Sequence, residues 1–223
     1  MIYLIGVEHG VQSISVDGEE TADHTKYRRC LEQAVRLYRP TVVAEEYSDD
    51  ALSKAKLVKN TQQEFFTRKI ARACNVGHLL CDTDRETKCS MGYQGESGWQ
   101  MLLLNLWTPQ PQSDMELLGA ALEVLKDFPL RENYWLRRLE HVLLHELVFV
   151  CGDYHVDTFG NRLRENGIQS QVVERQIGMP AELIERTERI KAYIQHNSQH
   201  IEDVFQEILE LHSGQIPPLS FPD

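Results

Sequence analysis

The sequence predicts an α/β fold with a mainly parallel central sheet and helices on both faces. Short apolar runs rich in β-branched residues stop abruptly at charged residues, as buried parallel strands do. Amphipathic stretches with helical spacing separate these runs. A repeated strand-helix-strand order implies right-handed crossovers, and these crossovers place parallel strands side by side in one sheet.

Five segments are expected to be strands of this sheet. The first four are short apolar runs that end at acidic residues or lead into a histidine motif, and the fifth is the mixed run 171–174. Such runs are typical of strands that are covered on both faces. The segments are 2–7, 41–44, 78–81, 147–151 and 171–174.

Helices are expected between and after these strands. The stretch 88–113 is rich in Gly, Gln, Ser and Pro, and we expect it to be an irregular insertion that serves as a lid or binding loop. We expect a single domain over 1–223, with 180–212 as a C-terminal helical extension that could cover the sheet edge or form a homodimer. The expected helices are 25–39, 61–75, 114–127, 130–146, about 156–166, about 181–195 and about 199–212, the last two separated at Asn197-Ser198.

The composition is that of an ordinary globular protein. The chain has 223 residues, of which 42% are hydrophobic, and 34 acidic residues against 23 basic ones give a net charge of −11. At this length folding buries roughly 70–75% of the surface of the unfolded chain, so a single core needs no disulfide. The negative charge repels phosphate backbones and anionic lipids. We therefore expect a small-molecule, cationic or metal partner and neither nucleic acid nor membrane.

The cysteines favour a reducing compartment. There are 5 of them, an odd number, and none lies in a CxxC pair. No apolar run approaches the roughly 20 residues of a membrane helix. A strand is expected directly after Met1, which leaves no room for a signal peptide. These features predict a cytoplasmic location.

The ends of the predicted strands carry the most informative residues. In open parallel sheets, ligands bind in the crevice outside the carboxyl ends of the strands. One such residue is weak evidence, because polar residues are expected wherever a strand meets solvent. Four successive strands that end in residues able to bind a divalent cation or transfer protons indicate a site. These residues are His9, Glu45 and Glu46, Asp82 and Asp84, and His155.

Two of the strand ends share a motif. Gly6-Val7-Glu8-His9 and Gly152-Asp153-Tyr154-His155 both have the pattern GxxH after a strand. Glycine allows a sharp backbone turn, and the histidine three residues later can then fold back over the sheet edge. A single GxxH is common by chance, so the motif gains meaning from its repetition at the same position relative to a strand.

With these two motifs the sequence resembles the TraB/PrgY/TIKI family, which is related to the ChaN and erythromycin-esterase-like proteins. The resemblance covers about residues 1–174. The strand-end glutamate of the family follows a proline by six residues and corresponds to Glu46, which follows Pro40. Glu45 is the neighbouring alternative, and the two side chains point to opposite faces if the strand continues through both.

Two further segments resemble the family in part. Its acidic strand end, usually Asp-Arg-Asp, is similar to Asp82-Thr83-Asp84, in which Thr83 stands in place of the arginine. Its Glu-Arg-Asp helix motif is similar to Leu130-Arg131-Glu132, in which Arg131 matches the arginine and Leu130 replaces the acid. The two substitutions affect the expected substrate contacts more than the histidine and glutamate set.

The family implies a hydrolase, and in the TIKI proteins a metal-dependent peptidase. In that case His9, His155 and Glu46 make a two-histidine, one-carboxylate ligand set with open positions for water. A divalent cation there, whether Mn, Co or Zn, lowers the pKa of bound water toward neutrality. The implied substrate is a peptide or another small amide or ester.

Three alternatives stay open at this point. In a metal-independent mechanism, closer to the erythromycin-esterase relatives, one histidine activates water as a general base and a carboxylate holds its tautomer. Arg131 would stabilise oxyanion charge in either mechanism. In a ChaN-like protein without catalysis, the same histidines would bind haem or iron. An interaction protein that keeps the scaffold would use its tail helices as the partner surface.

Several residues near the motifs are further candidates. Glu8, Asp82 or Asp153 could orient the histidines or act as the base. The candidate catalytic residues are Glu46, Arg131, Glu45 and Asp82, the candidate metal ligands are His9, His155 and Glu46, and the candidate substrate contacts are Glu8, Asp84, Asp153 and Tyr154.

Overall fold

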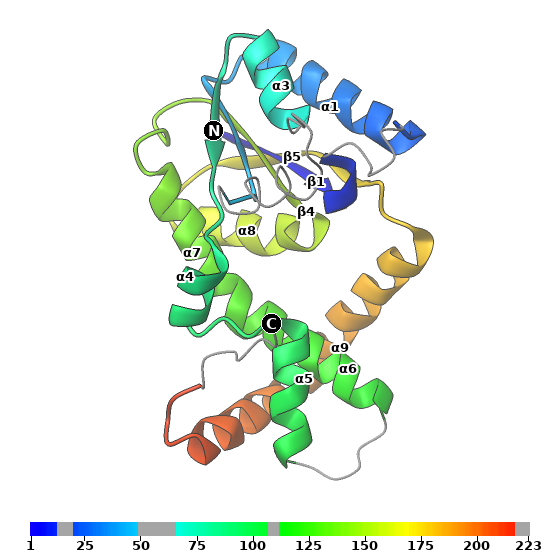
Figure 1. Cartoon of the computed structure of the whole chain (residues 1–223), viewed down its shortest axis with the longest axis vertical. Helices are drawn as coiled ribbons and strands as arrows, with labels where there is room; N and C mark the ends of the chain where they lie inside the picture. Colours follow the sequence, from blue (N-terminus) through cyan, green and yellow to red (C-terminus); the bar gives the residue numbers. More distant parts are fainter. Residues whose placement is uncertain (13–19, 49–65, 107–111, 217–223) are drawn as a thin grey trace. The chain divides into compact units, whose positions relative to one another are not determined.

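The computed structural model describes residues 1–12, 20–48, 66–106 and 112–216 (Figure 1). Contacts divide the chain into two compact units. The first, here called the sheet unit, comprises Met1–Asp84 and Glu132–Pro180. The second, the helical unit, comprises Arg85–Arg131 and Ala181–Asp223. The C-terminal helix, expected as an extension, is therefore grouped with the segment between Asp84 and Glu132.

The sheet unit contains a five-stranded parallel sheet with the strand order β3-β2-β4-β1-β5. The predicted α/β class and the parallel sheet are confirmed. All six residues of β4 are buried, as expected for a strand in the middle of a covered sheet. The strands are β1 (Ile2–Val7), β2 (Val42–Glu45), β3 (Gly77–Leu80), β4 (Leu147–Gly152) and β5 (Ser170–Ile177).

Side-chain alternation along the central strands builds two cores, one on each face of the sheet. Val148 and Val150 of β4 belong to one core, and Phe149 and Cys151 belong to the other. The helices α1 (Ala22–Tyr38) and α3 (Phe66–Ala73) pack on the first face. The residues of α7 (Phe128–Leu139) from Glu132 onward and α8 (Asp153–Glu165) pack on the second. Figure 1 shows α1 and α3 on one side of the strands and α8 on the other.

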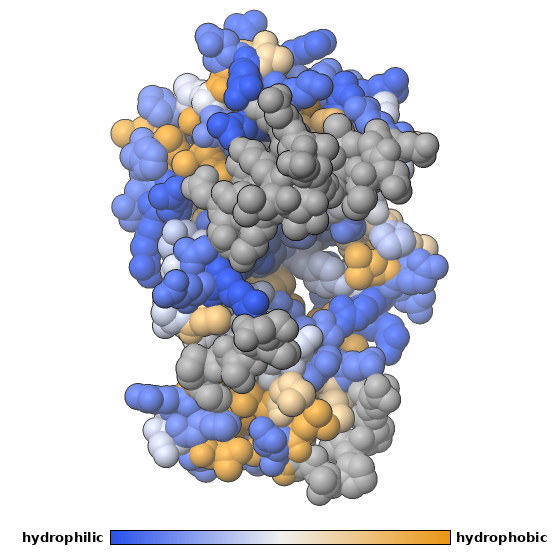
Figure 2. Space-filling view, viewed as in Figure 1, coloured by the Kyte–Doolittle hydropathy of each residue, from blue (hydrophilic) through white to orange (hydrophobic). Residues whose placement is uncertain are grey.

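The helical unit has its own core. Trp99, Leu103 and Leu122 are fully buried there, together with Ile201 and Ile208. Figure 2 shows a mostly hydrophilic face with apolar residues gathered over the helical unit. The elements of this unit are α4 (Arg85–Ser90), α5 (Gly95–Leu106), α6 (Gln112–Leu122), the π-helix η2 (Glu123–Asp127), the first residues of α7, and α9 (Ala181–Leu211).

The prediction of an irregular insertion over 88–113 is wrong for the residues of this stretch that the structure describes, 88–106 and 112–113. This stretch contains the end of α4, the whole of α5 and the start of α6. The apolar residues of α5, among them Trp99 and Leu102, are buried against the other helices of the unit. Tertiary packing therefore outweighs the low helix propensity of the glycine and serine residues in this stretch.

Several boundaries differ from the expected ones. Helix α1 begins at Ala22 because the Thr21 hydroxyl caps it, accepting a hydrogen bond from the His24 N–H at 3.4 Å. Helix α7 ends at Leu139 and not at residue 146, because turn hydrogen bonds replace the helical ones from there on. The expected separation of the last two helices corresponds to a kink in α9, where Asn197 has φ −124° and ψ 22°.

No helix among the described residues is long and apolar enough to cross a membrane. The five cysteines are free thiols.

Candidate functional site

The two GxxH motifs lie side by side at the carboxyl edge of the sheet. Strands β1 and β4 are parallel neighbours, with Gly6 opposite Cys151 and Val7 opposite Gly152. Each glycine makes room for the other motif. A Cβ atom on Gly6 would overlap the carboxylate of Asp153, and one on Gly152 would lie 2.9 Å from Nε2 of His9. The glycines are therefore needed for close approach between the two motifs, in addition to any freedom to turn.

His9 is held by a hydrogen bond that fixes its tautomer. It begins the short 3-10 helix η1 (His9–Gln12), and its Nδ1 lies 3.0 Å from Oε1 of Gln12. The amide nitrogen of Gln12 donates to Oε2 of Glu45 at 3.0 Å, so the amide oxygen must face His9. Because an amide oxygen only accepts, Nδ1 of His9 carries the hydrogen. In the neutral ring, Nε2 then has a lone pair.

His155 is held in the same way by a carboxylate. Its Nδ1 lies 3.0 Å from Oε1 of Glu132, and the Thr158 hydroxyl donates to the same oxygen at 2.5 Å. The rings of His155 and Trp135 pack edge to face, with ring centroids 4.7 Å apart. A carboxylate only accepts, so Nδ1 of His155 also carries the hydrogen and Nε2 has the lone pair when the ring is neutral.

Glu46 lies between the two imidazoles. Its Oε1 is 3.5 Å from Nε2 of His9 and 3.7 Å from Nε2 of His155. Its Oε2 accepts a hydrogen bond from the Gly152 N–H at 2.7 Å. We call these three side chains the His9–Glu46–His155 cluster. Two lone pairs and a carboxylate oxygen converge in it, and such a set of acceptors favours a cation, either a proton or a metal ion.

Glu45 points away from this cluster. It accepts from Gln12 through one oxygen, and its other oxygen lies 2.6 Å from Nε2 of His78 on β3. Glu46 is thus the carboxylate that faces both motif histidines. The two neighbours at the end of β2 project to opposite sides of the sheet, as alternation in a strand requires.

Asp82 and Arg131 are the other candidate catalytic residues. Asp82 accepts from the indole N–H of Trp135 at 3.3 Å, so it holds the ring that packs on His155. Arg131 belongs to the helical unit. The residue of α7 that hydrogen-bonds to His155 is Glu132, the next residue along the chain, which was not among the candidates.

The candidate substrate contacts differ in their roles. Glu8 accepts from the Gly10 N–H at 2.7 Å and so braces the turn that carries His9. Asp153 is buried and engaged by Arg175 at 3.2 Å and by the backbone N–H of Gln176, which indicates a structural role. Asp84 follows β3, and the Tyr154 hydroxyl is buried with no hydrogen-bond partner among the described residues.

Sequence reasoning missed the residues that orient the histidines. Gln12 and Glu132 are the two partners of the Nδ1 atoms. The available signal was helical spacing, because Glu132 and Trp135 lie three residues apart on α7 and both contact His155. No comparable local signal marks Gln12.

The spacing within the cluster is slightly wider than that of a closed metal site. Ligand atoms at 2.0–2.2 Å from one tetrahedral ion lie roughly 3.4 Å from one another. The two distances to Oε1 of Glu46 are 3.5 and 3.7 Å. Over the ranges that the structure describes, no group of three or more His, Cys, Asp or Glu side chains already has the arrangement of a metal site.

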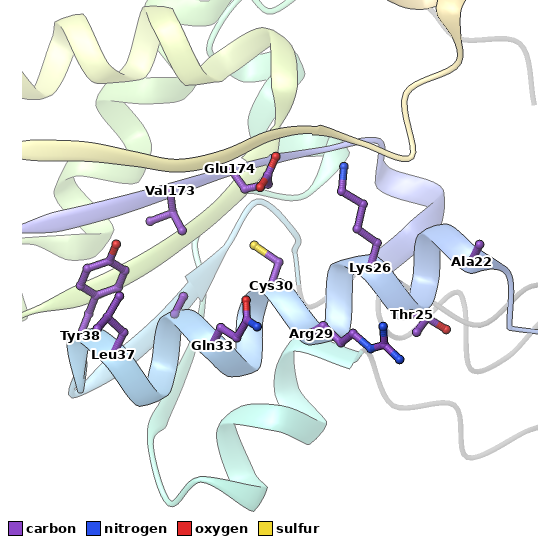
Figure 3. A pocket seen from close by; sticks show the side chains of 11 residues that line it. Ala22, Thr25, Lys26, Arg29, Cys30, Gln33, Leu37, Tyr38, Val173 and Glu174 are labelled. Carbon is purple, nitrogen blue, oxygen red and sulfur yellow. The ribbon is translucent and has the colours of Figure 1, made fainter.

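A cavity of about 590 Å³ lies between α1 and β5 in the sheet unit. None of the residues that line it belongs to the His9–Glu46–His155 cluster. Figure 3 shows Lys26 and Cys30 of α1 and Glu174 of β5 directed toward the space between the helix and the strand. Burial raises the pKa of the Cys30 thiol to about 11, so this thiol is protonated at neutral pH and is a poor nucleophile.

Comparisons of the chain with protein-family models, curated proteins and solved structures found no match. The TraB/PrgY/TIKI resemblance therefore stays a prediction that depends on the motif residues.

Proposed function

We propose that the protein is a hydrolase that activates water at the His9–Glu46–His155 cluster and cleaves an amide or ester bond. Its main support is the convergence of two imidazole Nε2 atoms on one buried carboxylate, with both Nδ1 atoms committed to other partners. A peptide or another small amide or ester is the proposed substrate. The strand-end position agrees with where open parallel sheets bind their ligands.

We propose different roles for His9 and His155 because their side chains differ in solvent exposure. The side chain of His9 is 43% exposed, whereas those of His155 and Glu46 are 4% and 0% exposed. His9 is therefore the member that meets solvent and substrate, and its Nε2 lone pair can accept a proton from water. The carboxylate of Glu46 then stabilises the imidazolium that forms, and the Gly152 N–H holds that carboxylate through its other oxygen.

A divalent cation, Mn, Co or Zn, is part of the proposal, and His9, Glu46 and His155 would hold it. The donor set fits, because histidine ligands typically donate their second ring N–H to a carboxylate or carbonyl oxygen, as the two histidines do to Glu132 and Gln12. When bound, such a cation polarises a carbonyl and makes water more acidic.

A metal-independent hydrolase is the second candidate. The distances of 3.5 and 3.7 Å favour it, because they exceed the spacing of a tetrahedral ligand set. A cytoplasmic location also belongs to the proposal and is supported by the free cysteines.

The decisive experiment is hydrolysis of a panel of p-nitrophenyl esters and fluorogenic peptides by the full chain. We expect Glu46→Gln to lower kcat/KM about 100-fold or more, the usual effect of losing a group that assists proton transfer. Glu165→Gln, at a glutamate whose side chain is 63% exposed, is the matched control and should keep activity within twofold. Activity that is equal in Glu46→Gln and wild type would overturn the proposal.

Metal content separates the two candidates. Protein purified without chelator should contain close to one Mn, Co or Zn ion per chain, and His9→Ala with His155→Ala should remove it. Full activity after chelation, with no ion detected, would instead favour the metal-independent mechanism. A Soret band on titration with haem, lost in the same double variant, would favour the haem-binding alternative.

A further inference from the structure

A chain of buried hydrogen bonds connects His9 to the edge of the sheet. Nδ1 of His9 lies 3.0 Å from Gln12, Gln12 donates to Glu45 at 3.0 Å, and Glu45 lies 2.6 Å from Nε2 of His78. Gln12 and Glu45 are fully buried, and the His78 side chain is 13% exposed. The four residues come from β2, β3 and the turn after β1.

This chain of hydrogen bonds lies on an otherwise apolar face of the sheet. Val43, which precedes Glu45 by two residues on β2, belongs to the core that also contains Tyr27 and Leu31 of α1. Burying an amide and a carboxylate in such a core is costly unless each group has a partner. Apolar residues would serve stability at least as well there. The polar chain is therefore better explained by what it does to His9.

We infer that His78 is a positioning residue that fixes the tautomer of His9 through Glu45 and Gln12. The inference rests on the proposed function only in giving His9 a chemical role. The hydrogen bond from His78 occupies one oxygen of Glu45, and the other oxygen accepts the amide hydrogen of Gln12. The Gln12 oxygen is thereby turned toward His9.

Without His78 this order is lost. Glu45 would have an oxygen without its histidine donor, and its carboxylate could rotate away from Gln12. The Gln12 amide would then lose the acceptor that holds its N–H group, and it could flip. A flipped amide presents N–H to Nδ1 of His9, and the ring then carries its hydrogen on Nε2. In that form Nε2 faces Glu46 as a donor and no longer offers a lone pair to water.

A separate contact keeps the ring in place when the tautomer changes. The Tyr47 hydroxyl donates to the backbone carbonyl of His9 at 3.1 Å, and the two rings meet edge to face with centroids 5.7 Å apart. Variants of His78 should therefore change which nitrogen of His9 is protonated and leave the position of the ring nearly unchanged.

The test is the tautomer of His9, measured by long-range ¹H–¹⁵N correlation of the imidazole nitrogens in the chelator-treated full chain at pH 8. We expect wild type to show only the Nδ1–H form, and His78→Leu to show at least one fifth of the Nε2–H form. Because His78→Leu leaves Glu45 buried with one donor fewer and could fail to fold, the double variant Glu45→Leu/His78→Leu provides a fully apolar replacement with the same expected outcome.

Two controls accompany this measurement. His155, whose tautomer depends on Glu132, should stay in the Nδ1–H form in every variant. His141→Gln, at an exposed turn position, should leave His9 unchanged. An unchanged His9 tautomer in both His78 variants would overturn the inference.

The measurement of the His9 tautomer does not depend on hydrolysis, so failure of the inference about His78 can be distinguished from failure of the proposed function. Where hydrolysis is detected, His78→Leu should lower kcat with little change in KM. His78→Gln, which restores an N–H donor, should recover at least part of the loss. Loss of activity with a normal His9 tautomer would contradict the positioning role.

Discussion

Asp127 should make the helical unit less stable as the pH rises from 4 to 8. It is fully buried at the end of the π-helix η2, and its Oδ2 accepts from the N–H groups of Gln94 and Gly95 and from the indole of Trp99 at 3.1, 2.7 and 3.0 Å. Burial raises the pKa of Asp127 from 3.8 to about 7, and these donors only partly oppose the rise.

The direction of this change in stability follows from the number of protons that Asp127 binds in the folded and in the unfolded state. Below pH 3.8 the carboxyl is protonated in both the folded and the unfolded state, so its contribution to stability is fully present. Between pH 3.8 and about 7 only the unfolded state is ionised, and stability falls as the pH rises. At about 1.4 kcal/mol per pH unit, the total loss is about 4 kcal/mol, of which about 3 kcal/mol falls between pH 5 and 8.

Urea denaturation at pH 5 and pH 8, followed by tryptophan fluorescence, measures this loss. Asp127→Asn is neutral at every pH and should remove about 3 kcal/mol of the difference in unfolding free energy between the two pH values. Asp114→Asn, at an exposed carboxyl of α6, is the control and should behave like wild type. Equal pH dependence in wild type and Asp127→Asn would refute the reasoning.

Three further predictions concern the sheet unit. Gly152→Ala places a Cβ 2.9 Å from Nε2 of His9 and should lower kcat/KM at least tenfold, whereas Gly160→Ala, whose Cβ would have ordinary contact at 3.6 Å, should be tolerated. Thr158→Val removes a hydrogen bond to Glu132, the buried carboxylate that holds His155. It should lower the free energy of unfolding, measured by urea denaturation, by about 1 kcal/mol. Alkylation of Cys30 by iodoacetamide, followed by mass spectrometry, should accelerate about tenfold per pH unit up to pH 10; a plateau near pH 8 would contradict its raised pKa.

The sequence sufficed to predict the sheet and the two motif histidines because both depend on local patterns. Apolar runs that are buried on both faces stop where the chain leaves the core, so the strand ends are visible as charged residues. Parallel order then brings His9, Glu46 and His155 to one edge. The helix of 95–106 was missed because its glycine and serine residues favour a loop. The helix forms because its apolar face is buried against helices that are distant in the sequence.

The partners of the histidines could not be predicted in the same way. Gln12 meets Glu45 across 33 residues, and Glu132 meets His155 across 23. Such contacts depend on the order of strands β2, β4 and β1 and on the path of α7, which no local spacing encodes. The choice of Arg131 over its neighbour followed from the family pattern, whereas the tautomer of His155 depends on Glu132.

Treating Glu45 and Glu46 at the end of β2 as alternatives was incomplete, because both acids act on His9. Alternation along a strand sends consecutive side chains to opposite faces, so one of them reaches the two histidines directly and the other reaches His9 from behind through Gln12. Glu46 faces the Nε2 atom of His9, and Glu45 controls its Nδ1 atom through the intervening amide. A glutamate pair at this strand end therefore specifies both sides of the same imidazole, and neither acid could take over the role of the other from its own face of the sheet.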